Sequence, residues 1–172
     1  MIFRHNKSVS LSDLVKCKTS ALQENMVSTC HRGEYKVLGA SGAIAAIDTY
    51  QFEENGILVL KDGSKAGKIQ FAEGKYSVIG TSVVLIPNEA CDARYLYFAM
   101  SSIDFEKYKV GSGIPHIYFK DYGKAKIFCP SYSEQLRYAK LLSVIDDNLL
   151  AEQNILTNFG LQKQYLLHHM FI

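Results

Sequence analysis

Residues 131–170, SYSEQLRYAKLLSVIDDNLLAEQNILTNFGLQKQYLLHHM, decide the architecture of this 172-residue chain. Ser131 and Glu134 have the spacing of a helix-capping box, so a helix is expected to begin directly after Pro130. Positions spaced alternately three and four residues apart then continue for about four heptads, the repeat of a coiled-coil seam. Its two polar members are Glu152 and Lys163, and its apolar members are Leu142, Ile145, Leu149, Leu156, Phe159, Leu166 and Met170.

This helix, expected over residues 133–170, needs a partner. At its usual rise it would be ~57 Å long, which exceeds what a domain of this size can cover. Gly160 lies inside it and costs about 1 kcal/mol of helix stability. The chain contains no second helix pattern of this length, so we expect the partner to be another chain. Further apolar residues widen the stripe, namely Leu141, Leu150, Ile155, Leu161 and Leu167.

The chain before Pro130 has a different character, because short β-rich runs alternate there with glycine, asparagine and aspartate turns. Two short helices are expected, over 10–16 with Ser10 as N-cap and over 93–102 after Asp92. The predicted fold class is α+β, with a compact, mixed β-rich domain over 1–130 and a long helix over 131–172. Strands are expected at 35–39, 43–48, 57–60, 68–71, 76–80, 82–87 and 124–129.

Composition and charge limit the classes of function. The chain is 48% hydrophobic and 21% charged, as in a globular protein. Residues 1–130 contain 16 Lys and Arg against 13 Asp and Glu, whereas residues 131–172 contain 3 against 4, so a polyanion should meet the first part. No run approaches the roughly 20 apolar residues of a membrane helix, and no signal peptide is recognised, so we expect a cytoplasmic protein.

The four cysteines, at positions 17, 30, 91 and 129, are scattered without a C-x-x-C pair. We interpret them as reduced thiols of a cytoplasmic protein, with two disulfides as the alternative. Cys30 and His31 are adjacent residues of types that bind metal ions, but the sequence has no second such pair at ligand spacing, so no metal site is predicted.

The stretch KDGSKAG (61–67) raises the question of a phosphate-binding loop. It does not match G-x-x-x-x-G-K-[ST], because Gly63 and Gly67 are four residues apart and Lys68 precedes Ile69. It also lies between two strand-like runs, whereas a nucleotide-binding loop should open a helix. Asp62-Gly63 is a hairpin-turn signal, so the prediction is a hairpin that presents lysines at its tip.

Other candidates for chemistry are weak. GASG (39–42) and GSG (111–113) are interpreted as tight turns, with backbone approach to phosphate oxygens as the alternative. CPSY (129–132) faintly resembles the [Asn/Asp]-Pro-Pro-[Tyr/Phe] motif of amino-methyltransferases, but cysteine cannot accept the required hydrogen bonds. No catalytic residue is predicted, and the pattern favours a binding module over an enzyme.

Six stretches share an ordered pattern that covers nearly the whole chain. They are LSDLVKCKTS (11–20), YKVLGASGAIAAID (35–48), ILVLKDGSKAGKIQFAEGKYSV (57–78), RYLYFAMSS (94–102), GSGIPHIYFKDYGKAKIFCPSYSEQ (111–135) and LLSVIDD (141–147). In this order they resemble the specificity subunit of type I restriction–modification enzymes. Ser131 departs from the family's pattern, because it stands where the second proline of P-P is usual.

The resemblance implies a half-length form, with one target recognition domain and one long helix where the family usually has two of each. It implies a non-catalytic subunit that recognises one half of a bipartite site in double-stranded DNA. The helices of two chains would form an antiparallel coiled coil that docks methyltransferase subunits. A restriction subunit can accompany them. No cofactor is expected on this chain, with S-adenosylmethionine and ATP on the partner subunits.

The candidate DNA-binding residues follow from this resemblance and from residue type. Phosphate contacts are expected from Lys61, Lys65, Lys68, Lys109, Arg32 and Lys36. Base contacts are expected from Ser64, Tyr35, Ser112 and His116. For each of them the alternative is a solvated surface residue. For the whole chain, one alternative is a truncated half-subunit that only assembles with the methyltransferase, and another is a nucleotide-binding enzyme.

Overall fold

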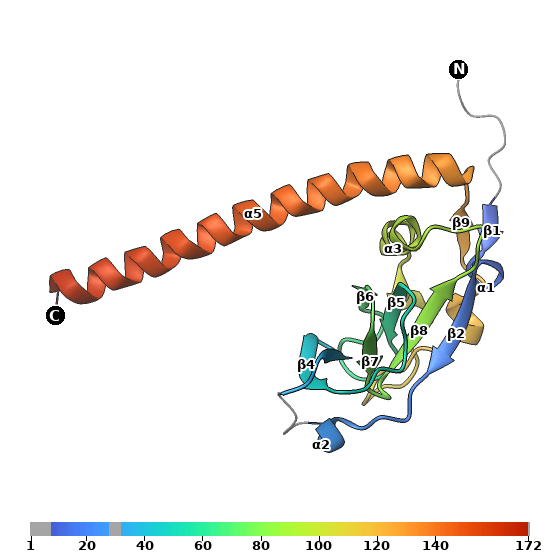
Figure 1. Cartoon of the computed structure of the whole chain (residues 1–172), viewed down its shortest axis with the longest axis horizontal. Coiled ribbons are helices and arrows are strands. Elements are labelled where there is room, and N and C mark those ends of the chain that lie inside the picture. The colour runs from blue at the N-terminus through green and yellow to red at the C-terminus, as the bar shows by residue number, and fades with distance from the viewer. Residues whose placement is uncertain (1–7, 28–31, 172) are drawn as a thin grey trace.

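The computed structural model describes residues 8–27 and 32–171 of the chain. Figure 1 shows a globular, strand-rich domain and one long helix that runs over it and projects far beyond it. The predicted α+β class is therefore confirmed. Cys30 and His31, the adjacent pair of residue types that bind metal ions, lie outside the described residues.

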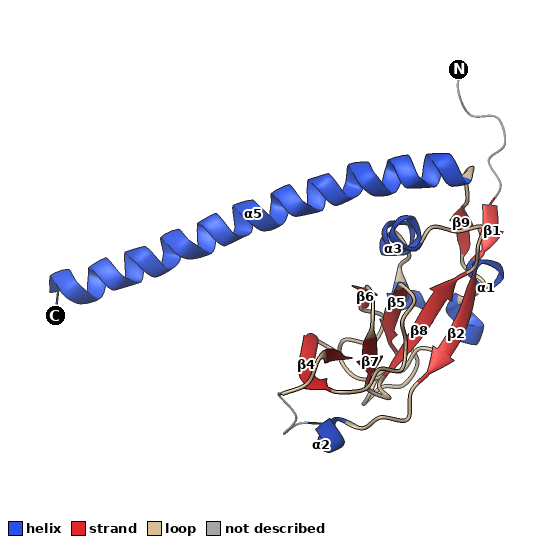
Figure 2. Ribbon diagram, viewed as in Figure 1, coloured by secondary structure: helices blue, strands red, loops and turns tan. Residues whose placement is uncertain are grey.

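The strands of the predicted mixed β-rich domain form three small sheets (Figure 2). Strand order is β1-β9 in one sheet, β2-β8-β5-β6 in the second and β4-β3-β7 in the third. Only the β3–β7 pair is parallel among the pairings between these strands. The strands are β1 (Ser8–Ser10), β2 (Val15–Thr19), β3 (Tyr35–Gly39), β4 (Gly42–Ile47), β5 (Gly56–Leu60), β6 (Ile69–Ala72), β7 (Tyr76–Val78), β8 (Ser82–Pro87) and β9 (Lys126–Phe128).

The helices other than the last are short. They are α1 (Leu11–Leu14), α2 (Glu24–Val27), α3 (Ala93–Ser101), the 3₁₀ helix η1 (Phe105–Tyr108) and α4 (Phe119–Tyr122). The last helix is α5 (Tyr132–Phe171). Asp92 caps α3 as predicted, since its Oδ1 accepts a hydrogen bond from the N–H of Tyr95 (2.7 Å).

The prediction of a helix over 10–16 with Ser10 as its cap was wrong in two respects. Ser10 stands at the N-cap of α1, but its side chain makes no capping hydrogen bond. The helix ends at Leu14, because Val15 takes an extended conformation and begins β2, which pairs with β8 from Val15 opposite Pro87. The sequence reading missed β2, since edge pairing of a mixed polar and apolar run overrides weak local preference.

The hydrophobic core lies between the four-stranded sheet and α3. All five residues of β5 are buried, which is expected of a strand with packing on both faces. Leu96 and Met100 of α3 are fully buried against this sheet, in a cluster that Tyr122 of α4 and Ala139 of α5 complete. Burial raises the pKa of the Tyr122 phenol far above its usual range. The core therefore fixes β5, and with it the loop that follows β5.

The start of α5 is fixed to the domain through Gln135, which is fully buried. Its Oε1 accepts a hydrogen bond from the backbone N–H of Asp92 (2.8 Å), and its Nε2 donates to the carbonyl oxygens of Ala90 (3.1 Å) and Pro130 (3.0 Å). The Tyr138 ring also lies 6.3 Å from that of Tyr95, between centroids. One turn of α5 is thus bonded directly to the start of α3.

The predicted capping box at Ser131 and Glu134 forms only in part. The backbone N–H of Ser131 donates to Glu134 Oε2 (3.1 Å), as such a box requires. The Ser131 hydroxyl, however, donates to the same carboxylate (2.6 Å) instead of accepting from the N–H of Glu134. These hydrogen bonds to the charged form lower the pKa of the Glu134 carboxyl.

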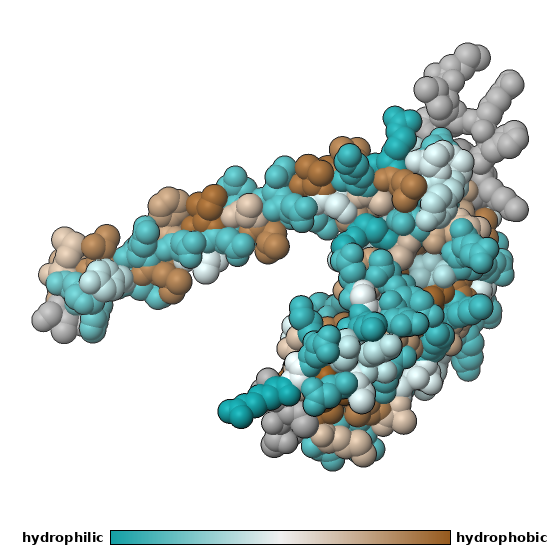
Figure 3. All heavy atoms as spheres, viewed as in Figure 1, coloured by the Kyte–Doolittle hydropathy of each residue, from teal (hydrophilic) through white to brown (hydrophobic). Residues whose placement is uncertain are grey.

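Beyond Lys140, α5 leaves the domain. Its 40 residues correspond to ~60 Å of helix, and from residue 144 to Phe171 every side chain is exposed. Figure 3 shows hydrophobic side chains along this projecting part. The seven apolar seam residues have exposed fractions from 37% at Leu142 to 73% at Leu156.

Candidate nucleic-acid interface

The loop from Lys61 to Lys68 joins β5 to β6, which pair antiparallel from Gly56 opposite Ala72 to Val59 opposite Ile69. The loop is closed by hydrogen bonds from Leu60 N–H to the Lys68 carbonyl (3.0 Å) and from Gly67 N–H to the Leu60 carbonyl (2.8 Å). The predicted hairpin is therefore confirmed. Because it leads into a strand, the loop lacks the helix N-terminus on which a nucleotide phosphate usually rests.

Two glycines give this loop its shape. Gly63 and Gly67 both have φ of +88°, a backbone conformation that residues other than glycine rarely adopt. At Gly67 a Cβ atom would also lie 2.6 Å from Cβ of Phe105, so the loop packs on η1. Ala66 is buried beneath the tip, and Ser64, Lys65 and Lys68 are exposed.

A second loop, Val110–His116, is bonded to the first. Val110 and His116 exchange backbone hydrogen bonds of 2.9 and 2.8 Å, which close the GSG turn. His116 Nδ1 then lies 2.7 Å from Oδ1 of Asp62 in the first loop. Backbone bonds from Gly63 N–H to the Pro115 carbonyl (3.0 Å) and from Ile117 N–H to the Lys61 carbonyl (2.9 Å) complete the attachment.

The turn between β3 and β4 contributes the third loop. Lys65 Nζ donates a hydrogen bond to Oγ of Ser41 (3.1 Å), and Gln70 Nε2 donates to the Gly39 carbonyl (2.9 Å). The two other glycine clusters noted in the sequence thus each contact the loop 61–68. We call the segments 39–42, 61–68 and 110–116 the three-loop surface. Gly42 and Gly111 have positive φ as well, which confirms the interpretation as tight turns.

The predicted phosphate-contacting lysines differ in their surroundings. Lys65 and Lys68 are exposed, whereas Lys61 is half-buried at the base of its loop. The Lys109 side chain is only 19% exposed and forms an ion pair with Glu106 (2.6 Å). Lys65, Lys68 and Lys109 line a groove of about 650 Å³ between the loop and η1, together with Asp104 and Glu106. The cationic character of this groove is therefore partly offset.

Arg32, Tyr35 and Lys36 lie apart from the three-loop surface. Tyr35 pairs with Ile47 at one end of the β3–β4 hairpin, and Gly39 pairs with Gly42 at the other. Four residues of strand separate the two ends by ~13 Å. The structure therefore places the predicted residues in two groups. The first group lies at or beside the three-loop surface and contains Lys61, Ser64, Lys65, Lys68, Lys109, Ser112 and His116. The second group contains Arg32, Tyr35 and Lys36.

Beside Tyr35 of the second group, the structure places two residues that sequence reasoning missed, Tyr50 and Lys75. The Tyr50 ring lies 5.0 Å from that of Tyr35, between centroids, and Lys75 Nζ lies 4.7 Å from the Tyr50 ring centre. The pKa of Lys75 is raised by its electrostatic interaction with the hydroxyl groups of Tyr50 and Tyr35. Partial loss of solvent raises the pKa of the Tyr35 phenol, and a hydrogen bond with Glu34 raises it further. No local signal marks this cluster, because it joins three separate segments.

Other kinds of site find little support. Across residues 8–27 and 32–171, no three His, Cys, Asp or Glu side chains gather closely enough to hold a metal ion. Over the same part of the chain, no helix is both long and apolar enough to span a bilayer. The exposed loops and the projecting helix are therefore the features that a function must explain.

A strand-rich domain followed by a long projecting helix is also the fold of known restriction–modification subunits. The chain aligns with an S subunit of a type I restriction–modification system from M. genitalium at a TM-score of 0.71 and 22% identity, over 96% of this chain and 46% of that one. It aligns with the HsdS subunit from Thermoanaerobacter tengcongensis at 0.62 and 14%, over 87% and 39%.

The sequence comparison places the chain in a family. The family described as "Type I restriction modification DNA specificity domain" matches residues 4–158, so the chain belongs to this family. It is also 35% identical over 105 residues to the type I restriction enzyme MjaVIII specificity subunit of Methanocaldococcus jannaschii, a match that spans 59% of this chain and 24% of that protein. The chain thus spans less than half the length of these relatives.

Proposed function

We propose that this chain is a non-catalytic, sequence-specific DNA-binding specificity subunit of a type I restriction–modification system. The observation that carries the proposal is the three-loop surface, in which exposed loops of a specificity domain are held in fixed relation by hydrogen bonds. Preorganised loops suit recognition, because less conformational entropy is lost when they bind.

The three-loop surface combines two kinds of contact. Lys65 and Lys68 are exposed ammonium groups, which suit phosphate oxygens and position a duplex without reading its sequence. Ser64 and Ser112 are exposed hydroxyls on neighbouring loops, and hydroxyls both donate to and accept from base edges. Lys65 lies on one loop and donates a hydrogen bond to Ser41 on another, so a phosphate bound at Lys65 would be held in a fixed position relative to both loops.

Dimerisation follows from the exposed seam of α5. An apolar stripe over about four heptads is unfavourable in water and is buried when a second helix packs on it. Two copies related by a two-fold axis place one recognition domain at each end of the helix pair. The target of such a dimer is palindromic and bipartite, with two inverted half-sites separated by an unread spacer.

In this proposal the chain directs other subunits to DNA. The methyltransferase subunit, with S-adenosylmethionine, docks on the paired helices, and a restriction subunit with ATP joins the complex. Methyl transfer and cleavage take place on those subunits. The chain acts in the cytoplasm, where the DNA and these partners are.

Selection of bound sequences from random duplexes, followed by gel shift with and without the methyltransferase, tests the proposal. The expected result is enrichment of one palindromic bipartite sequence that competes better than random DNA at physiological salt. Absence of duplex binding even with the methyltransferase present would contradict it. Retention of the methyltransferase without a protected DNA sequence would identify the chain as an assembly module instead.

A further inference from the structure

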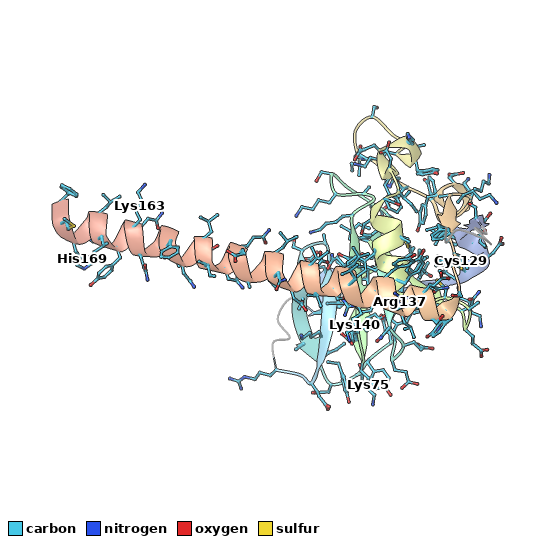
Figure 4. All side chains as sticks on the ribbon, turned by 90° about the horizontal axis from the view of Figure 1, so that it is seen from above. Lys75, Cys129, Arg137, Lys140, Lys163 and His169 are labelled. Carbon is cyan, nitrogen blue, oxygen red and sulfur yellow. The ribbon has the colours of Figure 1, made fainter. Side chains whose placement is uncertain are left out.

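Two charged residues interrupt the seam of α5. Glu152 and Lys163 occupy seam positions, and both are exposed. They are 11 residues apart, which corresponds to ~16 Å along the helix, so they cannot pair with each other within one chain. In the described part of the chain, neither forms an ion pair. Figure 4 shows Lys163 on the projecting part of α5, far from the globular domain.

We propose that two copies of this chain pair antiparallel through α5 in the register that sets Glu152 of each chain against the partner's Lys163. The proposal rests on the dimer proposed above and specifies how that dimer is aligned. In this register the two-fold axis passes between Thr157 and Asn158. The other seam pairs across the interface are then Leu156 with Phe159, Leu149 with Leu166, and Ile145 with Met170.

This alignment satisfies the geometry of the seam as well as its charges. Seam positions fall into two classes, those followed by a three-residue step and those followed by a four-residue step. In an antiparallel pair, a member of one class lies opposite a member of the other. Every pair in the proposed register joins the two classes. The register also pairs residues 145–170 of both helices, which uses nearly all the projecting length.

The neighbouring registers leave charges without partners. A shift of one heptad in one direction sets Glu152 opposite Leu156 and Lys163 opposite Ile145. A symmetric alignment that sets Leu156 against its own copy places Glu152 opposite Gly160 and Lys163 opposite Leu149. An unpaired charge in an apolar seam is costly, whereas a paired charge is far less so. A polar seam residue is a known means of fixing register at some cost in stability.

The register has a geometrical consequence for the recognition domains. The domains attach around Ala139, whose side chain is buried against the core. In the proposed register the two Ala139 positions lie ~55 Å apart along the helix pair. One pair of opposite charges, used twice across the two-fold axis, therefore fixes the separation of the two DNA-reading surfaces.

Charge reversal in the full-length chain tests the register, with the dimer dissociation constant measured by sedimentation equilibrium. Glu152→Lys sets two pairs of like charge across the seam, and so does Lys163→Glu. Each single variant is expected to weaken dimerisation at least about ten-fold. The combined variant restores opposite charges and should return to within about three-fold of the wild type. A mixture of the two single variants should form the heterodimer in preference to either homodimer.

Asp147→Lys is the matched control, because Asp147 lies on the helix side away from the seam and should leave the dissociation constant unchanged. Far-ultraviolet circular dichroism of each variant verifies that the helix is retained. A wild-type dimer whose affinity the combined variant does not recover would overturn the register and leave the dimer standing. A wild-type chain that stays monomeric up to hundreds of micromolar would overturn both.

Discussion

Asp62 and His116, 54 positions apart in the chain, lie 2.7 Å apart and join the hairpin loop after β5 to the loop that closes on Val110. The contact is only partly shielded, with the His116 side chain 40% and the Asp62 side chain 35% exposed. Its energy is therefore modest, but it holds two loops of the three-loop surface in one arrangement.

Asp62→Ala is expected to weaken binding to the selected DNA sequence about two- to ten-fold, the range of one ordinary hydrogen bond. Removal of a negative charge near DNA would by itself strengthen binding, so a loss identifies the loss of loop positioning. His116→Ala combined with Asp62→Ala should cost little more than His116→Ala alone, because both remove the same link. Asp48→Ala, an exposed acid beyond β4, is the control. Tighter binding by Asp62→Ala would contradict the positioning role.

Lys65→Ala should reduce the steepness of the salt dependence of DNA binding. One phosphate contact contributes about one unit to the slope of log K against log salt concentration, so the slope should fall by roughly one. The measurement is a salt titration by fluorescence anisotropy on the selected duplex and on random DNA, and both should weaken similarly. Lys124→Ala, an exposed lysine outside the three-loop surface, should leave the slope unchanged. An unchanged slope for Lys65→Ala would remove this residue from the phosphate contacts.

Gln135→Ala should lower the free energy of unfolding by about 2 kcal/mol, because it leaves the Asp92 N–H and two carbonyl groups without their partner. Urea denaturation followed by circular dichroism measures the change. Gln164→Ala, on the exposed part of α5, should alter stability by less than about 0.5 kcal/mol. Equal effects of the two substitutions would show that Gln135 contributes no more than a surface residue.

Gly160→Ala and Gly63→Ala should act in opposite directions, although a Cβ atom meets nothing within 4 Å at either position. Gly160 is helical, so alanine should stabilise the chain by about 1 kcal/mol. Gly63 has φ of +88°, so alanine there should destabilise it by about 1–2 kcal/mol. Thermal unfolding at matched protein concentration gives both changes. A stabilising Gly63→Ala would contradict the turn conformation described here.

Particular elements show how far sequence reasoning extends. The long helix, the cap of α3 by Asp92 and the hairpin around Asp62-Gly63 depend on local signals, and the structure contains all three. β2 was missed, because it is held by pairing with β8, 72 residues away at the first pair, Val15 with Pro87. The division of the strands into three sheets likewise depends on which distant strands pair.

The candidate interface divides in the same way. The family resemblance and residue type selected Lys65, Ser112 and His116, but only the fold shows that their loops touch and that Lys109 is engaged by Glu106. The Tyr35–Tyr50–Lys75 cluster was not predictable, since its three members come from separate segments and no periodicity links them.

The projecting helix, its apolar seam and the glycines at the turns could be predicted without a structure, because helix periodicity and positive φ are local properties of the chain. The attachment of the distant glycine loops 39–42 and 110–116 to the loop 61–68, and of the helix to the domain through Gln135, is seen only in the folded chain. Those contacts depend on long-range burial and hydrogen bonding, which bring residues together according to the packing of the whole domain and not according to their order in the chain.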